Sequence, residues 1–253
     1  MQLQARKISP THGITFQANY TWSKILTDAD SVWNTGATNP ENPTCIKCEY
    51  GLAAYNLTQR SVANFVYELP FGRMDALSHV PGRLTRGWKV QGIFQAQIGY
   101  PFTVYSPYGT LQYGSGGSTR PFFLQKATFS PTEGKEPQFF SNAVIGNNGG
   151  MGTGYFDIPT ALSPVNGQVQ AAAGNLGRDT FTAPGWSNLD FSILKDTNLT
   201  ESKMLQFRAE FFNIPNFATF AGPGATLGST NFGISGNTQT AERQIQFGLR
   251  FVF

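Results

Sequence analysis

Hydrophobic and polar residues alternate strictly at the carboxy-terminal end of the chain, in the stretch RQIQFGLRFVF. Every second residue from Ile245 onward is large and apolar, and the residues between are mostly glutamine, glycine and arginine. The apolar positions are Ile245, Phe247, Leu249, Phe251 and Phe253. Because successive side chains of a β-strand point to opposite faces, this pattern predicts a strand with one apolar face.

Six further segments alternate in the same way and predict strands over 1–7, 14–24, 62–71, 88–104, 188–194 and 203–213. In ITFQANYTW, for example, the apolar series runs from Ile14 to Trp22, and threonine, glutamine and asparagine occupy the other face. No segment shows convincing helical periodicity. We therefore expect an all-β protein with about seven antiparallel strands.

Alternation alone fits either a soluble β-sandwich or a membrane barrel, because both have one apolar and one polar face. Several predicted strands approach the roughly 10 residues that cross a bilayer, whereas average strands have about 5–6. Aromatic residues also end several apolar faces, which is typical of interfacial girdles. We expect these to be Tyr20, Trp22, Phe71, Trp88, Tyr100 and Phe102. The pattern favours an antiparallel transmembrane β-barrel segment, with a soluble sandwich binding module as the alternative.

Long and shorter links alternate between the predicted strands. The long links are 28–59, 105–185 and 214–243, and the shorter ones include 72–87 and KDTNLTES. Outer-membrane barrels have long extracellular loops and short periplasmic turns. If the last strand ends at the periplasm, all three long links are extracellular. We therefore divide one partial barrel, 1–253, into strands within 1–104, a loop at 105–185, and the last three strands within 186–253.

Composition narrows the classes of protein further. Charged residues make up 13% of the chain, about half of the roughly 25% of soluble domains. The net charge of +3 comes without a basic stripe, which argues against nucleic acid as a partner. No stretch approaches the roughly 18 apolar residues of a membrane helix. The amino-terminal residues lack the apolar core of a signal peptide.

Five charged residues fall on the polar faces of the predicted strands: Glu68, Lys89, Arg208, Glu210 and Arg250. In a barrel these faces line the lumen. We expect the charges to pair with one another or with a plug domain, because charges away from bulk water need partners.

Cys45 and Cys48 form the one CxxC pair of the chain. A zinc site needs about four ligands, and no second CxxC or HxxxH completes one. We expect a small loop disulfide in an oxidising compartment, with a metal or redox pair as the alternative. The two histidines lie apart from any nucleophile elbow. GNNGGMGTG (146–154) lacks the ending of a phosphate loop. We therefore expect no enzyme, catalytic residue, metal or cofactor.

Several blocks together resemble one family: YTWSK, RSVANFVYELPFG, RGWKVQGIFQAQIGYPFTV, GNLGRDTFTAPGWSNLDFSILKD, LQFRAEFFNIPNF and RQIQFGLRFVF. In this order they resemble the C-terminal part of TonB-dependent outer-membrane receptors, most of all the Oar-like group with a carboxypeptidase-regulatory-like domain. The resemblance implies a barrel of about 22 strands, of which this chain would supply the last seven or so. It also implies energised uptake, with the TonB complex as a partner acting through N-terminal parts.

The same resemblance implies contact with outer-membrane lipid and with the barrel-assembly machinery, which reads a last strand such as Ile245 to Phe253. The ligand class stays open between a small chelate or vitamin, an oligosaccharide and a peptide. The sequence shows no TonB box, plug or signal peptide, so we expect a piece of a longer gene. A truncated, nonfunctional gene product is a further alternative.

Overall fold

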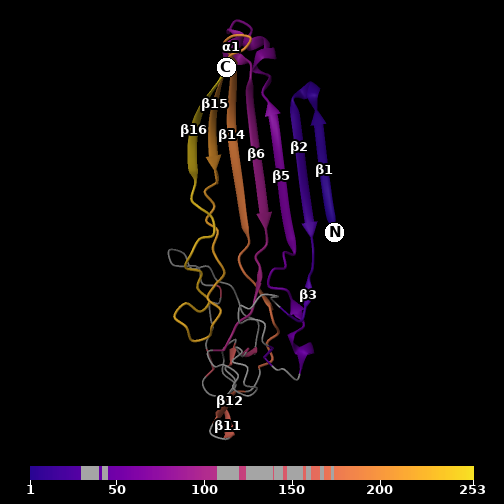
Figure 1. Ribbon diagram of the computed structural model, residues 1–253, viewed down its shortest axis with the longest axis vertical. Helices are drawn as coiled ribbons and strands as arrows, with labels where there is room; N and C mark the ends of the chain where they lie inside the picture. The colour runs from indigo at the N-terminus through magenta and orange to yellow at the C-terminus, as the bar shows by residue number, and fades with distance from the viewer. Residues whose placement is uncertain are drawn as a thin grey trace.

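The structure is a computed structural model, and one large sheet runs along its long axis (Figure 1). It describes residues 1–29, 40–41, 45–106, 120–123, 139, 145–146, 156–157, 161–165, 168–171 and 174–253. Long links gather at one end of the sheet and short turns lie at the other end. We call these the loop end and the turn end.

The large sheet has seven antiparallel strands, each paired with its neighbours in chain order. They are β1 (Gln2–Ser9), β2 (Ile14–Trp22), β5 (Gln59–Glu68), β6 (Trp88–Gln97), β14 (Trp186–Asn198), β15 (Met204–Phe212) and β16 (Gln244–Val252). All seven predicted strands are confirmed. They form one layer, not the two packed layers of a sandwich. In the described part of the chain, β1 and β16 are the edges of an open sheet.

The register brings the apolar positions of all seven strands to one face. One row reads Ala18, Ala63, Phe94 and Leu189, and another reads Phe191, Phe211 and Ile245. A slip of one residue in any ladder would move a whole strand's apolar set to the other face. The six ladders therefore build one continuous apolar face and one polar face.

The predicted strand 88–104 is wrong at its end, because β6 ends at Gln97. A side chain at Gly99 would meet the Ala183 carbonyl oxygen at 1.8 Å, and one at Gly185 would meet the Gln97 carbonyl oxygen at 2.5 Å. The returning chain thus runs close beside the end of β6 and keeps one register, since Gln97 pairs with Trp186 and Pro101 pairs with Thr182. Pairing stops after Gln97 and resumes at Pro101. Other bounds shift less: β5 covers 59–68 and β14 extends over 186–198.

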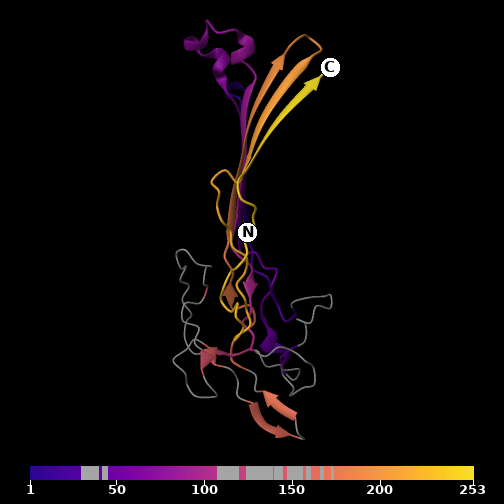
Figure 2. The ribbon, with the colours of Figure 1, turned by 90° about the vertical axis from the view of Figure 1, so that its left-hand side faces the viewer.

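At the turn end, η1 (Pro10–His12) joins β1 to β2, and a tight turn joins β14 to β15. The longer link between β5 and β6 contains η3 (Pro70–Arg73), η4 (Asp75–Leu77) and α1 (Gly82–Thr85). We call residues 69–87 the turn-end link. Seen edge-on, it leaves the sheet on one side, and the ends of β14–β16 bend to the other (Figure 2).

At the loop end, short paired segments form what we call the loop lobe, the described residues of 23–58, 98–185 and 213–243. Its elements are β3 (Leu26–Thr27), η2 (Ile46–Glu49), β4 (Gly51–Leu52), β7 (Pro101–Phe102), β8 (Phe122–Phe123), β9 (Ile145–Gly146), β10 (Phe156–Asp157), β11 (Ala161–Val165), β12 (Gln168–Ala171) and β13 (Phe181–Thr182). Its core contains Val104, Phe156, Leu176 and Leu227, with five further phenylalanines packed around them.

Candidate functional site

The apolar face of the sheet is open to its surroundings. Phe247, Leu249 and Phe253 are 68%, 71% and 89% exposed. Among the described residues, Ala209 is the one buried apolar side chain that belongs to the large sheet. Exposed apolar surface of this extent marks contact with a membrane or a partner. The strand-by-strand alternation matches the lipid face of a barrel.

The predicted C-terminal signal residues share this face on β16, with Phe253 following the strand end. The Phe247 ring stacks on Phe207 of β15 at 6.3 Å between centroids, and the Phe251 ring stacks on Phe253 at 5.7 Å. This aromatic series is continuous with the apolar face of β15. Its role in assembly stays a prediction.

The predicted interfacial aromatics lie at both ends of the sheet. Tyr20 and Trp22 end β2 at the loop end, and Tyr100 follows the end of β6 there. Trp88 begins β6 at the turn end, and Phe71 in η3 packs edge-on against it, with 6.4 Å between centroids. These positions suit girdles at two membrane interfaces.

Phe102 is a correction to this set. It belongs to β7, which pairs with β13 through Phe181, and it lies in the loop lobe. Its ring lies 5.5 Å from that of Phe139 and 5.8 Å from that of Phe181. The alternation of apolar and polar residues continues from Tyr100 to Val104, beyond the end of β6. The sequence pattern therefore wrongly placed Phe102 in the strand.

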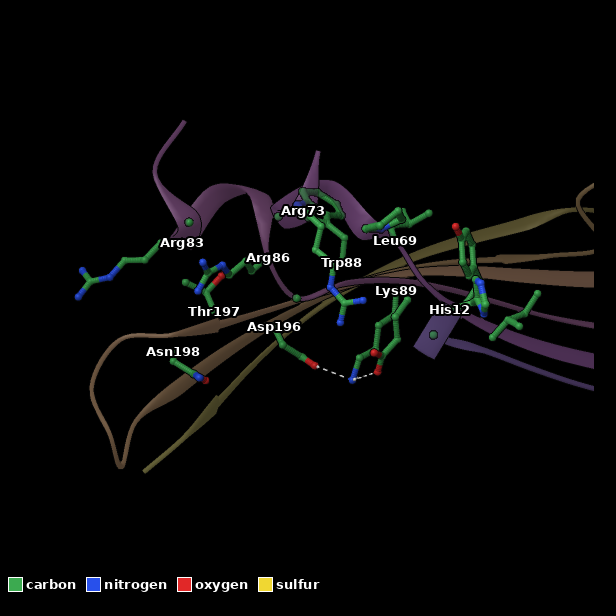
Figure 3. Close-up of a pocket in the computed structure, with 18 of the residues that line it drawn as sticks. His12, Leu69, Arg73, Arg83, Arg86, Trp88, Lys89, Asp196, Thr197 and Asn198 are labelled. Carbon is green, nitrogen blue, oxygen red and sulfur yellow. Dashed lines mark ion pairs between the residues drawn. The ribbon is translucent and has the colours of Figure 1, made fainter. Parts of the chain in front are cut away.

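The predicted charges on the polar face lie close to partners. Lys89 Nζ lies 3.6 Å from Glu68 Oε1 and 3.6 Å from Asp196 Oδ2 (Figure 3). These side chains are between 22% and 60% exposed, so each pair contributes about 1 kcal/mol or less. Asp196 was not among the predicted charges, because the predicted strand 188–194 ends before it whereas β14 extends to Asn198.

A second charged set lies nearer the β16 edge. Arg208 Nη2 donates to Glu210 Oε1 at 3.0 Å within β15. Arg250 faces Gln206 across the β15–β16 ladder, and Gln206 Nε2 donates to Asp196 Oδ1 at 2.7 Å. The five predicted residues therefore share the polar face but form separate groups.

A hollow of about 1360 Å³ lies where the turn-end link meets the sheet. Its lining is rich in cations, and it includes Lys7, Arg73, Arg83, Arg86 and Lys89 beside Glu68 and Asp196. This concentration of charge could not be predicted from the sequence, because its members come from β1, β5, β6, β14 and the turn-end link. No single sequence window contains them.

A buried ion cluster holds the loop lobe together. Arg120 Nη2 lies 2.8 Å from Glu41 Oε2, and Arg120 Nη1 lies 2.7 Å from Glu49 Oε2. The three side chains are only 2–8% exposed. The Arg120 amide also donates to Glu41 Oε1 at 2.8 Å. Residues separated by more than 70 positions are thereby joined.

One cation here serves two carboxylates. Desolvation by burial raises the pKa of Glu41, and it outweighs the attraction to Arg120. Burial by itself lowers the pKa of Arg120, but the hydrogen bond with Glu49 and the charges of both carboxylates raise it overall. Arg120 therefore stays charged, and burial makes Glu41 easier to protonate than an exposed glutamate.

The structure joins Cys45 to Cys48 in a disulfide directly beside this cluster. The pair brackets the start of η2, which carries Glu49. The Cys48 carbonyl oxygen lies 3.5 Å from Arg120 Nη2. The disulfide thus closes the segment that presents Glu49 and this carbonyl to Arg120.

The FNIPNF stretch (212–217) begins the last long link and holds the two ends of this link together. Asn213 has a positive φ of 49°, and its side chain bonds the Phe217 amide and carbonyl and the Ala241 carbonyl. Asn216 Oδ1 accepts from the Arg243 amide at 2.9 Å. Asparagine tolerates this left-handed conformation better than most residues. Both ends of 214–243 are therefore fastened beside β15 and β16.

The other sequence candidates form no assembled chemical site within the part of the chain that the structure describes. Among the described residues, no group of three or more His, Cys, Asp or Glu could hold a metal ion. His12 Nδ1 lies 2.9 Å from Ser9 Oγ in the exposed β1–β2 turn. The 146–154 segment lies outside the described residues except for Gly146. Within the described ranges, none of the helices is long and apolar enough to cross a membrane.

Comparison with protein families matches residues 1–246 to a family described as outer membrane beta barrel domain. Comparisons with curated proteins and with solved structures give no significant match. The match covers nearly the whole chain and agrees with the single antiparallel sheet and its exposed apolar face. The chain therefore belongs to the outer membrane beta barrel domain family and is a protein of the bacterial outer membrane.

Proposed function

We propose that this chain supplies wall strands and extracellular recognition loops to a TonB-dependent importer. The observation that carries the proposal is the difference between the two ends of the sheet. Short turns and one moderate link join the strands at one end, and three long links fold together at the other. Large loops built into one body provide a surface that can select a ligand before uptake.

Contacts within the loop lobe support this role. The first and second long links meet at Arg120 and Glu49. The second and third meet where Leu227 joins the core with Val104, and where the Leu227 amide donates to the Tyr105 carbonyl at 2.9 Å. Loops held by a shared core are preorganised, which lowers the entropic cost of binding.

An open sheet cannot stand in lipid by itself, because edge amides and carbonyls would lack hydrogen-bond partners there. In the proposal, further strands close the barrel, and a plug meets the charges on the polar face. The barrel-assembly machinery reads β16, and the TonB complex acts through N-terminal parts. The imported ligand is a small chelate or vitamin, an oligosaccharide or a peptide, and the chain performs no catalysis.

The decisive test is binding of the purified periplasmic domain of TonB to the complete gene product in detergent, measured by calorimetry. Saturable binding that disappears when the TonB box is deleted is the expected result. A complete gene product without a TonB box, or one that binds no TonB, would contradict energised import. The outer-membrane location would still hold.

Orientation is tested by cysteine labelling of whole cells with a membrane-impermeant maleimide. Ser229 is exposed in the loop lobe, and Glu201 is exposed in the β14–β15 turn. We expect Ser229→Cys to react in intact cells and Glu201→Cys to react only after lysis. The reverse pattern would overturn the assignment of loops to the outside.

A further inference from the structure

The turn-end link lies over the apolar face of the sheet, not over the polar face. Trp88 shares the apolar face with Val90 and Phe94, and its Nε1 donates to the Leu84 carbonyl at 2.8 Å. Lys195, the cross-strand partner of Trp88, donates to the carbonyls of Arg83 and Arg86. In Figure 3, Trp88 and the link lie on one side of the strands, and the Lys89–Asp196 pair lies on the other.

This position places the link against the lipid side of the barrel wall. Its irregular backbone cannot enter hydrocarbon, where unpaired amides and carbonyls have no partners. The link therefore lies at headgroup depth. Met74 and Leu84, which are 46% and 62% exposed, provide apolar side chains that can reach the acyl chains below.

Charge on the link is strongly biased. It carries three exposed arginines, Arg73, Arg83 and Arg86, against a single carboxylate, Asp75. Lys7 of β1 and Lys195 of β14 add two cations on the same face of the sheet. Lys195 already bonds the link carbonyls and lies over the Trp88 ring at 5.7 Å. The three arginine side chains are exposed, and Arg73 Nη1 also donates to the Thr11 carbonyl at 3.4 Å.

We propose that the turn-end link is a docking site for anionic phospholipid headgroups of the inner leaflet of the outer membrane. Arg73, Arg83 and Arg86 bind the phosphates, because guanidinium groups pair with phosphate through paired hydrogen bonds. Trp88 and Phe71 anchor the same level of the wall. The site is continuous with the lipid face already described. Its assignment to the inner leaflet rests on the orientation in the proposed function, but lipid binding does not rest on TonB.

The test compares lipid retention by the complete protein in native mass spectrometry. The probes are phosphatidylglycerol, zwitterionic phosphatidylcholine and diphosphorylated lipid A. The variant is R73Q/R83Q/R86Q, because glutamine keeps the aliphatic part of Arg86 that packs on Gly72. The matched control is Arg250→Gln, a cation near the same end but on the polar face.

We expect wild type and Arg250→Gln to retain phosphatidylglycerol in preference to phosphatidylcholine. Each arginine near an anionic surface strengthens binding about fivefold, so the triple variant should lose most of this preference. Equal retention by wild type and the triple variant would overturn the proposal. A preference for lipid A at the same arginines would overturn the assignment to the inner leaflet.

A second measurement does not depend on removing the arginines. A spin label at Leu84→Cys in lipid vesicles should respond to oxygen and to a water-soluble nickel reagent as a label at headgroup depth does. A label that is fully accessible to the aqueous reagent would contradict interfacial docking. Failure here, with normal TonB binding, would leave the importer proposal standing.

Discussion

The sheet and the loop lobe bury their hydrophobic residues in opposite ways. In the lobe, Val104, Phe156 and Leu227 are 0% exposed, as in the core of a water-soluble domain. In the sheet, Phe247 and Leu249 point outward and are about two-thirds exposed or more. The same hydrophobic effect governs both regions. The difference is the solvent, since lipid takes the place of a protein core around the sheet.

The charged residues of the lobe and of the sheet also differ in their burial and in the distance to their partners. The lobe encloses Arg120 between Glu41 and Glu49 at 2.7–2.8 Å. On the sheet, Lys89 lies 3.6 Å from each of its two acidic neighbours, all of them partly exposed. Charges removed from water need closer partners than charges that stay partly exposed, as those on the polar face do. The lobe is therefore the region most sensitive to loss of a single charge.

The largest effect should come from Arg120→Met. It leaves two buried carboxylates without their cation, which costs roughly 3–5 kcal/mol. We expect hydrogen exchange, measured by mass spectrometry, to become faster in peptides of the lobe and to stay unchanged in peptides of β14–β16. The matched variant E41Q/E49Q/R120M removes the stranded charges and should recover most of the protection. An equal increase in exchange in the lobe and in the sheet of Arg120→Met would contradict the difference proposed between the two regions.

Next in size is Phe247→Arg, which places a cation on the lipid face. An arginine near the bilayer midplane costs about 2–4 kcal/mol. We expect a lower midpoint of urea unfolding for the complete protein in phosphatidylcholine vesicles. Gln246→Arg, one residue away on the polar face, should change the midpoint little. Equal losses from both variants would contradict the assignment of the faces.

C45S/C48S should have a smaller effect that is confined to the lobe. A disulfide that closes so short a loop stabilises by about 2 kcal/mol in the chain-entropy description. We expect greater protease sensitivity near η2 with no change in urea unfolding of the sheet. Treatment of wild type with dithiothreitol should reproduce this result. Unchanged sensitivity would show that the ion cluster alone holds the segment.

The smallest effect should be the pH dependence due to Glu41. Its pKa in the folded lobe is raised above the usual 4.5 by burial. The folded lobe therefore holds this proton more tightly than the unfolded chain. The resulting stability is present below about pH 4.5 and is lost as the pH rises through the raised pKa. Lobe hydrogen exchange, corrected for its intrinsic pH dependence, should show this trend in wild type and less of it in Glu41→Gln.

Much of the sheet was predictable because its strands are long and their faces alternate without interruption. The series from Ile245 to Phe253 fixes its face whatever its partner, and the register then aligns it with Phe211. Strand ends were less predictable. The end of β6 at Gln97 is not marked by any change in the alternation, which runs on to Val104.

Some residues of the candidate sites could be placed from the sequence, and others could not. Sequence placed Glu68, Lys89, Arg208, Glu210 and Arg250 on one face, since period two is a local property of the backbone. It could not join Arg120 to Glu41 and Glu49, because that cluster depends on how two long links fold over each other.

By itself, the sequence determined the all-β class, the seven strands, and which side chains form the apolar face, because the alternation of a strand is a local property of the backbone. Tertiary structure alone decided that Phe102 packs in the lobe, and that the turn-end link lies over the apolar face. Both features depend on contacts between segments that are far apart in the sequence. Their contact energies are set by packing and desolvation in three dimensions, and no local pattern in the chain records them.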